Sequence, residues 1–296
     1  VTEIRDYAFH GCTSLESVTI PESVTEIGDY AFFGCRKLTA ITIPNSVTSI
    51  GKEAFYGCKS LKDITIPKSV RTIKSRTFTH CESLETVVIT KGVKTIGECA
   101  FSNCHSLESV TIPESVTLIG TDAFSYCKSL KSITIPKSVK EIKTGAFGEC
   151  KSLESIVISK GVTMIGEHTF RACTSLQSVT IPEGVTMISR HAFEGCTGLQ
   201  EVVIPEGVTS IGDCAFEGCT SLTSVTIPES VTEIVRSPWP VLMHAFSGCK
   251  SVESIVVAEG NPVYDSREGC NAIIETRTNT LFYGCNLQDN ICRFVQ

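Results

Sequence analysis

The sequence predicts a solenoid, in which short β-strands from successive coils stack in parallel along one axis. Three observations support this prediction. Ten copies of a 23-residue unit run without a gap from Val1 to Ser230, and an eleventh copy, Val231–Gly260, has seven extra residues. Each copy repeats the same apolar positions, and each carries one cysteine at the same place. Self-similarity at a period of roughly 20–50 residues is typical of units that bury their apolar faces only against their neighbours.

Two apolar motifs in the first copy each predict a short extended segment. The first is Val1-x-x-Ile4, and the second is Leu15-x-x-Val18-x-Ile20. Val18 and Ile20 share one face at a period of two, and β-branched residues favour a strand. Pro21 ends this strand because it has no N–H to donate to a ladder. Each coil therefore contributes one strand to each of two parallel sheets.

The segment between these motifs, Asp6–Gly11, has room for one helical or 3₁₀ turn that places Phe9 in the core. Glycine recurs at the eleventh position of several copies, among them Gly34, Gly57 and Gly195. Glycine there indicates a turn with positive φ, which other residues adopt less readily.

Eleven of the sixteen cysteines occupy one position of the unit: Cys12, Cys35, Cys58, Cys81, Cys104, Cys127, Cys150, Cys173, Cys196, Cys219 and Cys249. In a solenoid they form a ladder with one thiol per coil. A small, weakly polar thiol suits a tight inward site. Disulfides between neighbours would pull equivalent backbones out of register, and a straight row does not offer the tetrahedral convergence that zinc needs. We therefore expect a reduced, structural ladder.

Composition excludes several classes of function. The net charge of −6 is spread through the copies, with no basic stripe that would indicate nucleic-acid binding. No apolar run approaches the roughly 18–20 residues of a membrane span. No nucleophile with a base and an orienting group stands out, and no phosphate-binding glycine loop or metalloprotease motif is present. The sequence thus predicts no enzyme activity and no cofactor. Val1 already lies in register, so we expect the natural chain to extend further at this end.

The consensus V-T-x-I-G-x-x-A-F-x-G-C-x-S-L-x-S-V-T-I-P-x-S resembles the BspA-like leucine-rich repeats of bacterial and protist surface proteins, across residues 1–260. The segment Asn261–Cys285 resembles a module found within that family. The resemblance implies an α/β leucine-rich-repeat solenoid that is right-handed and mostly β, with short 3₁₀ or helical turns and its parallel sheet on the concave face. It also implies a secreted or cell-surface protein that binds host matrix proteins or other cells.

Two parts are expected: eleven repeats over residues 1–260, with the insertion near 235–244, and a capping segment over residues 261–296. The cap contains a hairpin that turns near Arg277 and Thr278. Pairing about that turn sets Ile274 opposite Leu281, Ile273 opposite Phe282, and Cys270 opposite Cys285. That register allows a disulfide between Cys270 and Cys285, and the alternative is two buried thiols.

The outward strand positions supply the first candidate binding residues, Thr111, Thr134, Thr180 and Thr226, in a row that also contains valines. Such a surface is suited to a protein or glycan, because solenoids commonly bind through their strands. The other interpretation is that short β-branched side chains simply suit crowded parallel strands.

Three further features are candidates. Glu183, Glu206 and Glu229 follow the strand in successive copies and form an acidic rim. Nothing inside the repeat offsets the repulsion between these like charges. The rim therefore favours either a basic partner or a solvated edge. Trp239, in the insertion, is either an exposed anchor or a residue folded onto the coil. His168, His191 and Cys214 share one repeat position and have zinc-binding chemistry, but we expect a curved ladder to spread them apart, so no metal site is predicted.

Two functions remain open. The first is a non-enzymatic adhesion module that binds a protein or glycan, and the second is a scaffold that self-associates through the same solenoid. A monomer that binds saturably favours the first, and concentration-dependent self-association favours the second.

Overall fold

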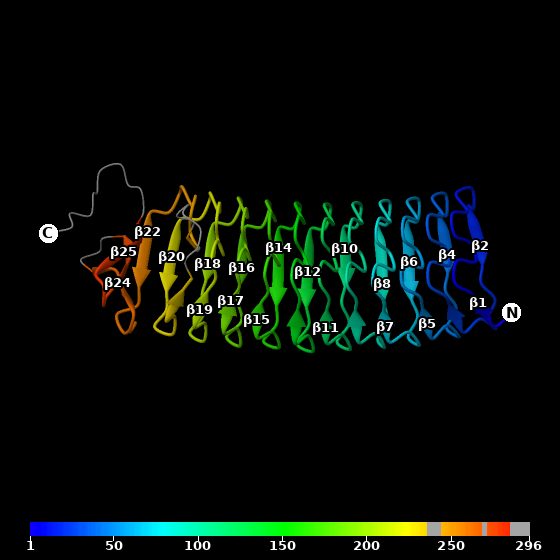
Figure 1. The fold of residues 1–296 in the computed structure, drawn as a ribbon, viewed down its shortest axis with the longest axis horizontal. Coiled ribbons are helices and arrows are strands. Elements are labelled where there is room, and N and C mark those ends of the chain that lie inside the picture. Colours follow the sequence, from blue (N-terminus) through cyan, green and yellow to red (C-terminus); the bar gives the residue numbers. More distant parts are fainter. Residues whose placement is uncertain (236–243, 268–270, 285–296) are drawn as a thin grey trace.

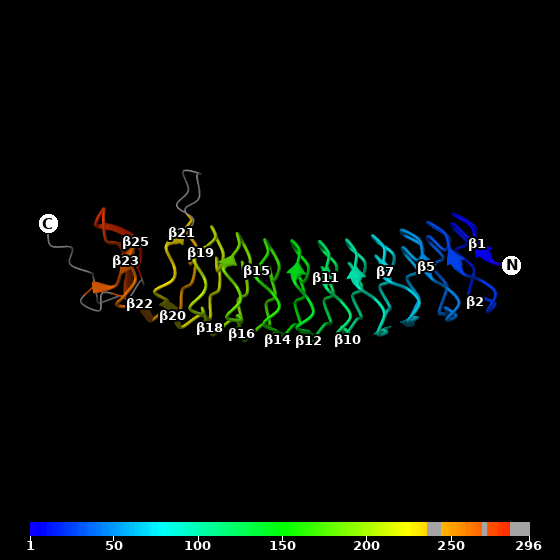
Figure 2. The same ribbon diagram turned by 90° about the horizontal axis from the view of Figure 1, so that it is seen from below.

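The computed structural model describes residues 1–235, 244–267 and 271–284. The coils lie side by side along one long axis, with the first coil and the last described residues, 271–284, at opposite ends of the rod (Figure 1). Each coil contributes a longer strand on one side, while a two-residue strand lies on the other (Figure 2). The predicted parallel β-solenoid is therefore confirmed, and no α-helix is present in the described ranges.

The longer strands share the sequence Ser-Val-Thr-Ile or a close variant and define the long-strand face. They are β2 Ser17–Thr19, β4 Ala40–Thr42, β6 Asp63–Ile66, β8 Thr86–Ile89, β10 Ser109–Thr111, β12 Ser132–Ile135, β14 Ser155–Ile158, β16 Ser178–Thr180, β18 Glu201–Val203, β20 Ser224–Ile227 and β22 Ser254–Val257. Strands β6 to β18 form one continuous seven-stranded parallel sheet, in which each strand pairs with the equivalent residues of the next coil.

The short strands each end in a buried isoleucine and form the short-strand face. They are β1 Glu3–Ile4, β3 Glu26–Ile27, β5 Ser49–Ile50, β7 Thr72–Ile73, β9 Thr95–Ile96, β11 Leu118–Ile119, β13 Glu141–Ile142, β15 Met164–Ile165, β17 Met187–Ile188, β19 Ser210–Ile211 and β21 Glu233–Ile234. The exception to the burial pattern is Ile4 of the first coil, which is half-buried. All described pairs in this row are parallel and in register.

The third side of each coil differs from the single helical turn that the sequence predicts. In the first coil, the N–H groups of Tyr7, Phe9 and Gly11 donate to carbonyls of the next coil, at 2.7–3.0 Å. Tyr7 and Gly11 have φ values of 60° and 69°, and this left-handed conformation recurs at both positions along the chain. The N–H groups between them, of Ala8 and His10, donate to carbonyls three residues earlier in the same coil. The N–H groups thus point in turn to the next coil and to the same coil, so no continuous helix forms. We call this side the turn edge.

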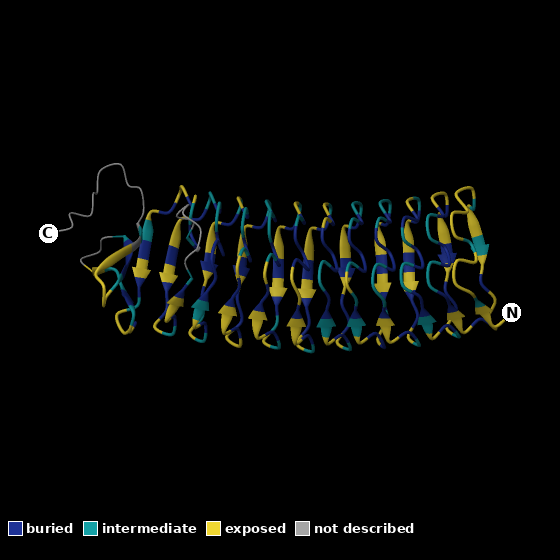
Figure 3. Ribbon diagram, viewed as in Figure 1, coloured by how far each residue is buried: buried dark blue, intermediate teal, exposed yellow. Residues whose placement is uncertain are grey.

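A ladder of ten phenylalanines fills the centre of the rod. From Phe32 to Phe246 they are almost completely buried, and neighbouring rings stack with centroids 5.2–5.8 Å apart. The thiols lie beside them, and each buried ladder cysteine donates to the carbonyl of the preceding coil's phenylalanine at 3.1–3.3 Å. Burial alternates with exposure along each long strand (Figure 3).

The last described segment covers the end of this core. Strands β23 Tyr264–Asp265, β24 Ala272–Glu275 and β25 Thr280–Gly284 form an antiparallel sheet. Ile273 and Tyr264 join the buried core, and the Tyr264 hydroxyl accepts a hydrogen bond from the Ile234 N–H at 2.9 Å. No helix that could span a membrane is found within the residues that the structure describes.

Hairpin pairing is partly as predicted. Ile274 lies opposite Leu281, but Ile273 lies opposite Tyr283 and not Phe282, because a bulge between Ile273 and Ile274 shifts the register by one residue. A bulge places two residues of one strand against one of its partner, which sequence symmetry about a turn does not reveal. Cys270 and Cys285 lie outside the described residues.

Candidate binding surfaces

The long-strand face presents a column of threonine and valine side chains. Thr111, Thr134, Thr180 and Thr226 are all exposed there, as the sequence predicts. In register with them are Val88, Val157, Val203 and Val256, which are 47–57% exposed. The parallel pairing aligns these side chains because equivalent residues of neighbouring coils lie opposite one another. The outward face is therefore a mixed apolar and hydroxyl surface.

A second column of outward side chains lies two residues earlier on the same strands. Over the central coils it consists almost entirely of serine. Ser109, Ser132, Ser155 and Ser178 pair in register along the sheet, and Glu201 follows them. These side chains are short, so they leave a surface of low relief beside the Thr/Val column. Valines at four positions of a threonine row were visible in the sequence, but their shared exposure is a structural result.

The acidic rim has more internal pairing than the sequence predicts. Glu183 lies 3.0 Å from Lys160 of the preceding coil, with both side chains about 80% exposed. The Glu206 carboxylate accepts hydrogen bonds from the N–H groups of Glu229 and Ser230, each at 3.3 Å. The expectation that nothing in the repeat relieves this row is therefore wrong for Glu183 and Glu206. A 23-residue periodicity places each carboxylate beside the neighbouring coils, where a lysine of the preceding coil or N–H groups of the following coil are within reach.

The cysteine ladder is structural. From Cys35 to Cys249 its members are buried free thiols, while Cys12 in the first coil is exposed. Burial raises the pKa of Cys35 to about 11 and that of Cys150 to about 12, so both remain protonated at neutral pH. A protonated, buried thiol neither attacks an electrophile nor binds a metal readily. The ladder packs the core and supplies no chemical site.

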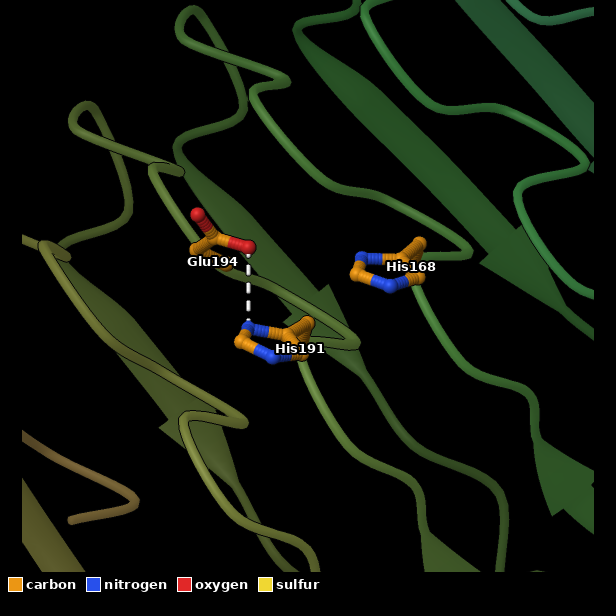
Figure 4. A group of neighbouring side chains, drawn as sticks. All are labelled: His168, His191 and Glu194. Atoms are coloured by element: carbon orange, nitrogen blue, oxygen red, sulfur yellow. Dashed lines mark ion pairs between the residues drawn. The ribbon is translucent and has the colours of Figure 1, made fainter. Parts of the chain in front are cut away.

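The turn edge brings together side chains that the sequence analysis expects to be spread apart. The His168 and His191 rings stack with their centroids 4.8 Å apart and their planes inclined by 7° (Figure 4). Glu194 Oε2 lies 2.9 Å from His191 Nδ1. The expectation of separation is wrong because the hydrogen-bonded coils fix the spacing of adjacent turn-edge residues. Glu194 was missed because it occupies a different repeat position, three residues after His191.

The same edge is hollowed where two glycines replace larger side chains. Gly145 stands where the neighbouring coils have Asp122 and His168, and Gly148 stands where they have Ser125 and Arg171. A hollow of about 410 Å³ opens there, with Glu149 and Glu194 also in its lining. Arg171 crosses it and contacts Glu149 at 3.3 Å and Glu194 at 3.1 Å. The charged and titratable side chains in its lining are thus three carboxylates, one histidine and one arginine, beside small and uncharged residues.

The short-strand face carries a second hollow of about 390 Å³, between Lys140–Lys143 and the residues Thr163, Met164, Thr186 and Met187. Met164 and Met187 are 40% and 36% exposed. This face has few other exposed apolar side chains in the described ranges, which makes it a useful comparison for the long-strand face. The predicted anchor Trp239 lies outside the described residues.

Comparison with known proteins agrees with this geometry. The family model described as "BspA type Leucine rich repeat region (6 copies)" matches residues 2–131 and 118–253. A leucine-rich cell surface protein from Faecalibacterium prausnitzii is 31% identical, over 87% of this chain and 83% of that one, with a TM-score of 0.49. No match was found among curated proteins.

Two further solved structures support the fold. A leucine-rich repeat protein from Eubacterium ventriosum is 24% identical, with a TM-score of 0.52 over 75% of this chain and 81% of that one. The pneumococcal vaccine antigen PcpA is 22% identical, with a TM-score of 0.57 over 89% of this chain and 76% of that one.

Proposed function

Because the chain belongs to the BspA-type leucine-rich repeat family, we propose that it is a non-enzymatic protein-binding module displayed at a cell surface. Its partner docks on the long-strand face. The observation that supports this most directly is the column of exposed valines among threonines on that face. The cell-surface description of the 31% identical relative from Faecalibacterium prausnitzii supports the location.

The valine column is more than scattered surface hydrophobicity. A single exposed valine needs no explanation, whereas apolar side chains gathered on one face mark interaction sites. Val88, Val157 and Val203 recur on the same seven-stranded sheet, and the threonines between them add methyl groups and hydroxyl donors. Thr111, Thr134 and Thr180 thus provide hydrogen bonds within an otherwise apolar contact.

The low relief and low charge of the face indicate what kind of partner fits. Its short side chains cannot clasp a projecting ligand, so large anchoring side chains come from the partner, as aromatic residues do at many interfaces. Asp63 and Glu201 are the acidic residues at the outward positions of the described long strands. Since few charges take part, binding through this face depends weakly on salt concentration.

The test is a binding screen of the chain against matrix proteins, other cell-surface proteins and glycans, at two salt concentrations. Hydrodynamic size is recorded in the same buffer. We expect saturable binding by a monomer to a protein ligand, with little loss at the higher salt concentration. A Glu183→Gln/Glu206→Gln/Glu229→Gln variant and a Trp239→Ala variant measure what the acidic rim and the insertion contribute.

Other outcomes of the screen are decisive against the proposal. If the chain self-associates with increasing concentration and binds nothing in the panel, the scaffold function replaces it. If binding collapses at higher salt and in the glutamine variant, the partner docks on the acidic rim and the long-strand face is not the site.

A further inference from the structure

We propose that the turn edge of coils eight and nine is a binding site for a divalent transition-metal ion, with His168, His191 and Glu194 as ligands. This site is separate from the long-strand face, and its failure leaves the proposed function untouched. Imidazole nitrogen and carboxylate oxygen are donors that Zn²⁺ takes in proteins, with three protein ligands and a water in sites that remain open.

The donors are already close together. One ligand atom from each of His168, His191 and Glu194 lies within 4.8 Å of the other two. In a tetrahedral zinc site with bonds of about 2.0–2.2 Å, two donors lie roughly 3.3 Å apart. The rings therefore need to close by about 1.5 Å at most. Rotation about the Cβ–Cγ bond of histidine is soft, so the side chains can make this change without moving the backbone.

The two imidazoles have unused coordinating atoms. Nδ1 of His168 and Nδ1 of His191 are buried and have no hydrogen-bond partner in the described part of the chain. The 2.9 Å contact of His191 with Glu194 is close but is not aligned as a hydrogen bond. Buried nitrogens without partners lose their hydration on folding. A bound ion restores a partner to both nitrogens at once.

Access and local charge are suited to an ion. The hollow formed at Gly145 and Gly148 opens beside His168 and Glu194. Asp122 and Glu149 add carboxylates to its wall. A cleft lined by one sign of charge concentrates ions of the opposite sign, and this hollow has three carboxylates to one guanidinium.

Arg171 occupies part of the place that the ion would take. Its Nε lies 3.1 Å from Glu194 Oε2, and its side chain is 43% exposed. Exposed pairs of this kind are weak, so an incoming dication can displace the guanidinium. The arginine consequently competes with the metal, and its removal should tighten binding.

A second donor set shares His191. Its other members are Cys214 and Glu217, again with donor atoms within 4.8 Å. Cys214 is buried and donates to Asp213 Oδ1 at 3.3 Å. We assign the ion to the His168 set because His168 and Glu194 line the hollow, which neither Cys214 nor Glu217 does. A thiolate signal distinguishes the two sets.

The experiment measures Zn²⁺ binding to untagged, fully reduced protein by isothermal titration calorimetry, with Co²⁺ as a spectroscopic substitute. We expect one ion per chain, and a Co²⁺ spectrum without a thiolate charge-transfer band. His168→Asn, His191→Asn and Glu194→Gln should each weaken binding by about tenfold or more. Asparagine is chosen because His168 and His191 have φ values of 54° and 55°, which asparagine tolerates.

Three further variants complete the design. Arg171→Gln should raise the affinity several-fold, a gain that a merely structural effect would not produce. His105→Gln, in a coil remote from the cluster, should leave binding unchanged. The assignment is overturned if no Zn²⁺ binds, or if binding survives unchanged in both histidine variants. A thiolate band abolished by Cys214→Ser also overturns it and places the ion on the second set.

Discussion

At the residue scale, one repeated contact explains why cysteine recurs at the twelfth position of the repeat. The Cys150 thiol donates to the Phe124 carbonyl at 3.2 Å, in the tight space beside the stacked rings. A larger side chain would overpack this site, and alanine would leave both a small void and a carbonyl with one partner fewer. The sequence predicts the reduced ladder, but not this hydrogen bond, because the carbonyl belongs to the preceding coil.

Burial of the ladder predicts a strong contrast in thiol reactivity. In native protein, iodoacetamide should modify the exposed Cys12 first, whereas Cys35 to Cys249 of the ladder should resist it. Burial raises the pKa of the Cys35 and Cys150 thiols, so little thiolate forms there, and the coil closes off access to the whole buried ladder. Mass spectrometry of labelled peptides, before and after denaturation, checks this outcome. Fast labelling of Cys104 or Cys150 in the native state would contradict the packing described here.

The left-handed positions of the turn edge allow a stabilising substitution. Ala172 has a φ of 56°, and the equivalent residue of the next coil is Gly195. Ala172→Gly should raise the free energy of unfolding by about 0.5–1 kcal/mol, because glycine has no Cβ to strain in this conformation. Denaturant titration measures the change.

Ala146→Gly is the matched control. Ala146 is completely buried and is not among the left-handed residues, so glycine there should lower stability by about 1 kcal/mol. If both substitutions destabilise equally, the left-handed conformation at residue 172 is not what limits stability there.

At the element scale, the regular strands could be predicted and the turn edge could not. A period of two with β-branched residues identifies the long strands from the sequence, and proline marks their ends. The turn edge has few β-branched residues and enough apolar spacing for one helical turn. Its hydrogen bonds run to the next coil, an interaction that local sequence does not encode. For the same reason, the sequence analysis expects His168 and His191 to lie apart, whereas the structure stacks them.

The terminal sheet depends on one buried side chain. Asn261 donates to the carbonyls of Pro228 and Val231, each at 2.8 Å, and accepts from the N–H groups of Val263 and Tyr264. These four bonds tie the start of β23 to the end of the tenth coil and the beginning of the eleventh. A bulged hairpin with a buried asparagine has no counterpart in the repeat, so periodicity gives no information about it.

Asn261→Ala should therefore loosen β23, β24 and β25 by at least about 2 kcal/mol, since several buried groups lose their partner. Hydrogen exchange should show lost protection in these strands and unchanged protection in β10 to β14, because solenoid units contact only their neighbours. Asn45→Ala, at an exposed asparagine, is the control and should change neither. Uniform loss of protection along the whole rod would contradict the local role of Asn261.

At the scale of the whole molecule, the repeat makes the architecture predictable and also determines which side chains form rows on the surface. Every outward residue is multiplied along the axis, so small differences between copies become rows of valine, serine or glutamate. Function is encoded in those departures from the consensus, such as Val157 for threonine or Gly145 for a larger residue. These departures can be read from the sequence alone, but the pairing of strands in the structure is needed to show which of them lie next to one another.

The most direct test of the central claim compares two faces of the same rod. Val157→Lys/Val203→Lys places two charges on the long-strand face, and Met164→Lys/Met187→Lys places two on the short-strand face. All four side chains are exposed, so both variants should fold with the stability of the parent protein. The affinity of each for the strongest protein ligand of the screen is then measured. We predict a loss of at least about tenfold, or roughly 1.4 kcal/mol, for the first variant and no change for the second. Equal affinities, or a loss confined to the methionine variant, would contradict docking on the long-strand face.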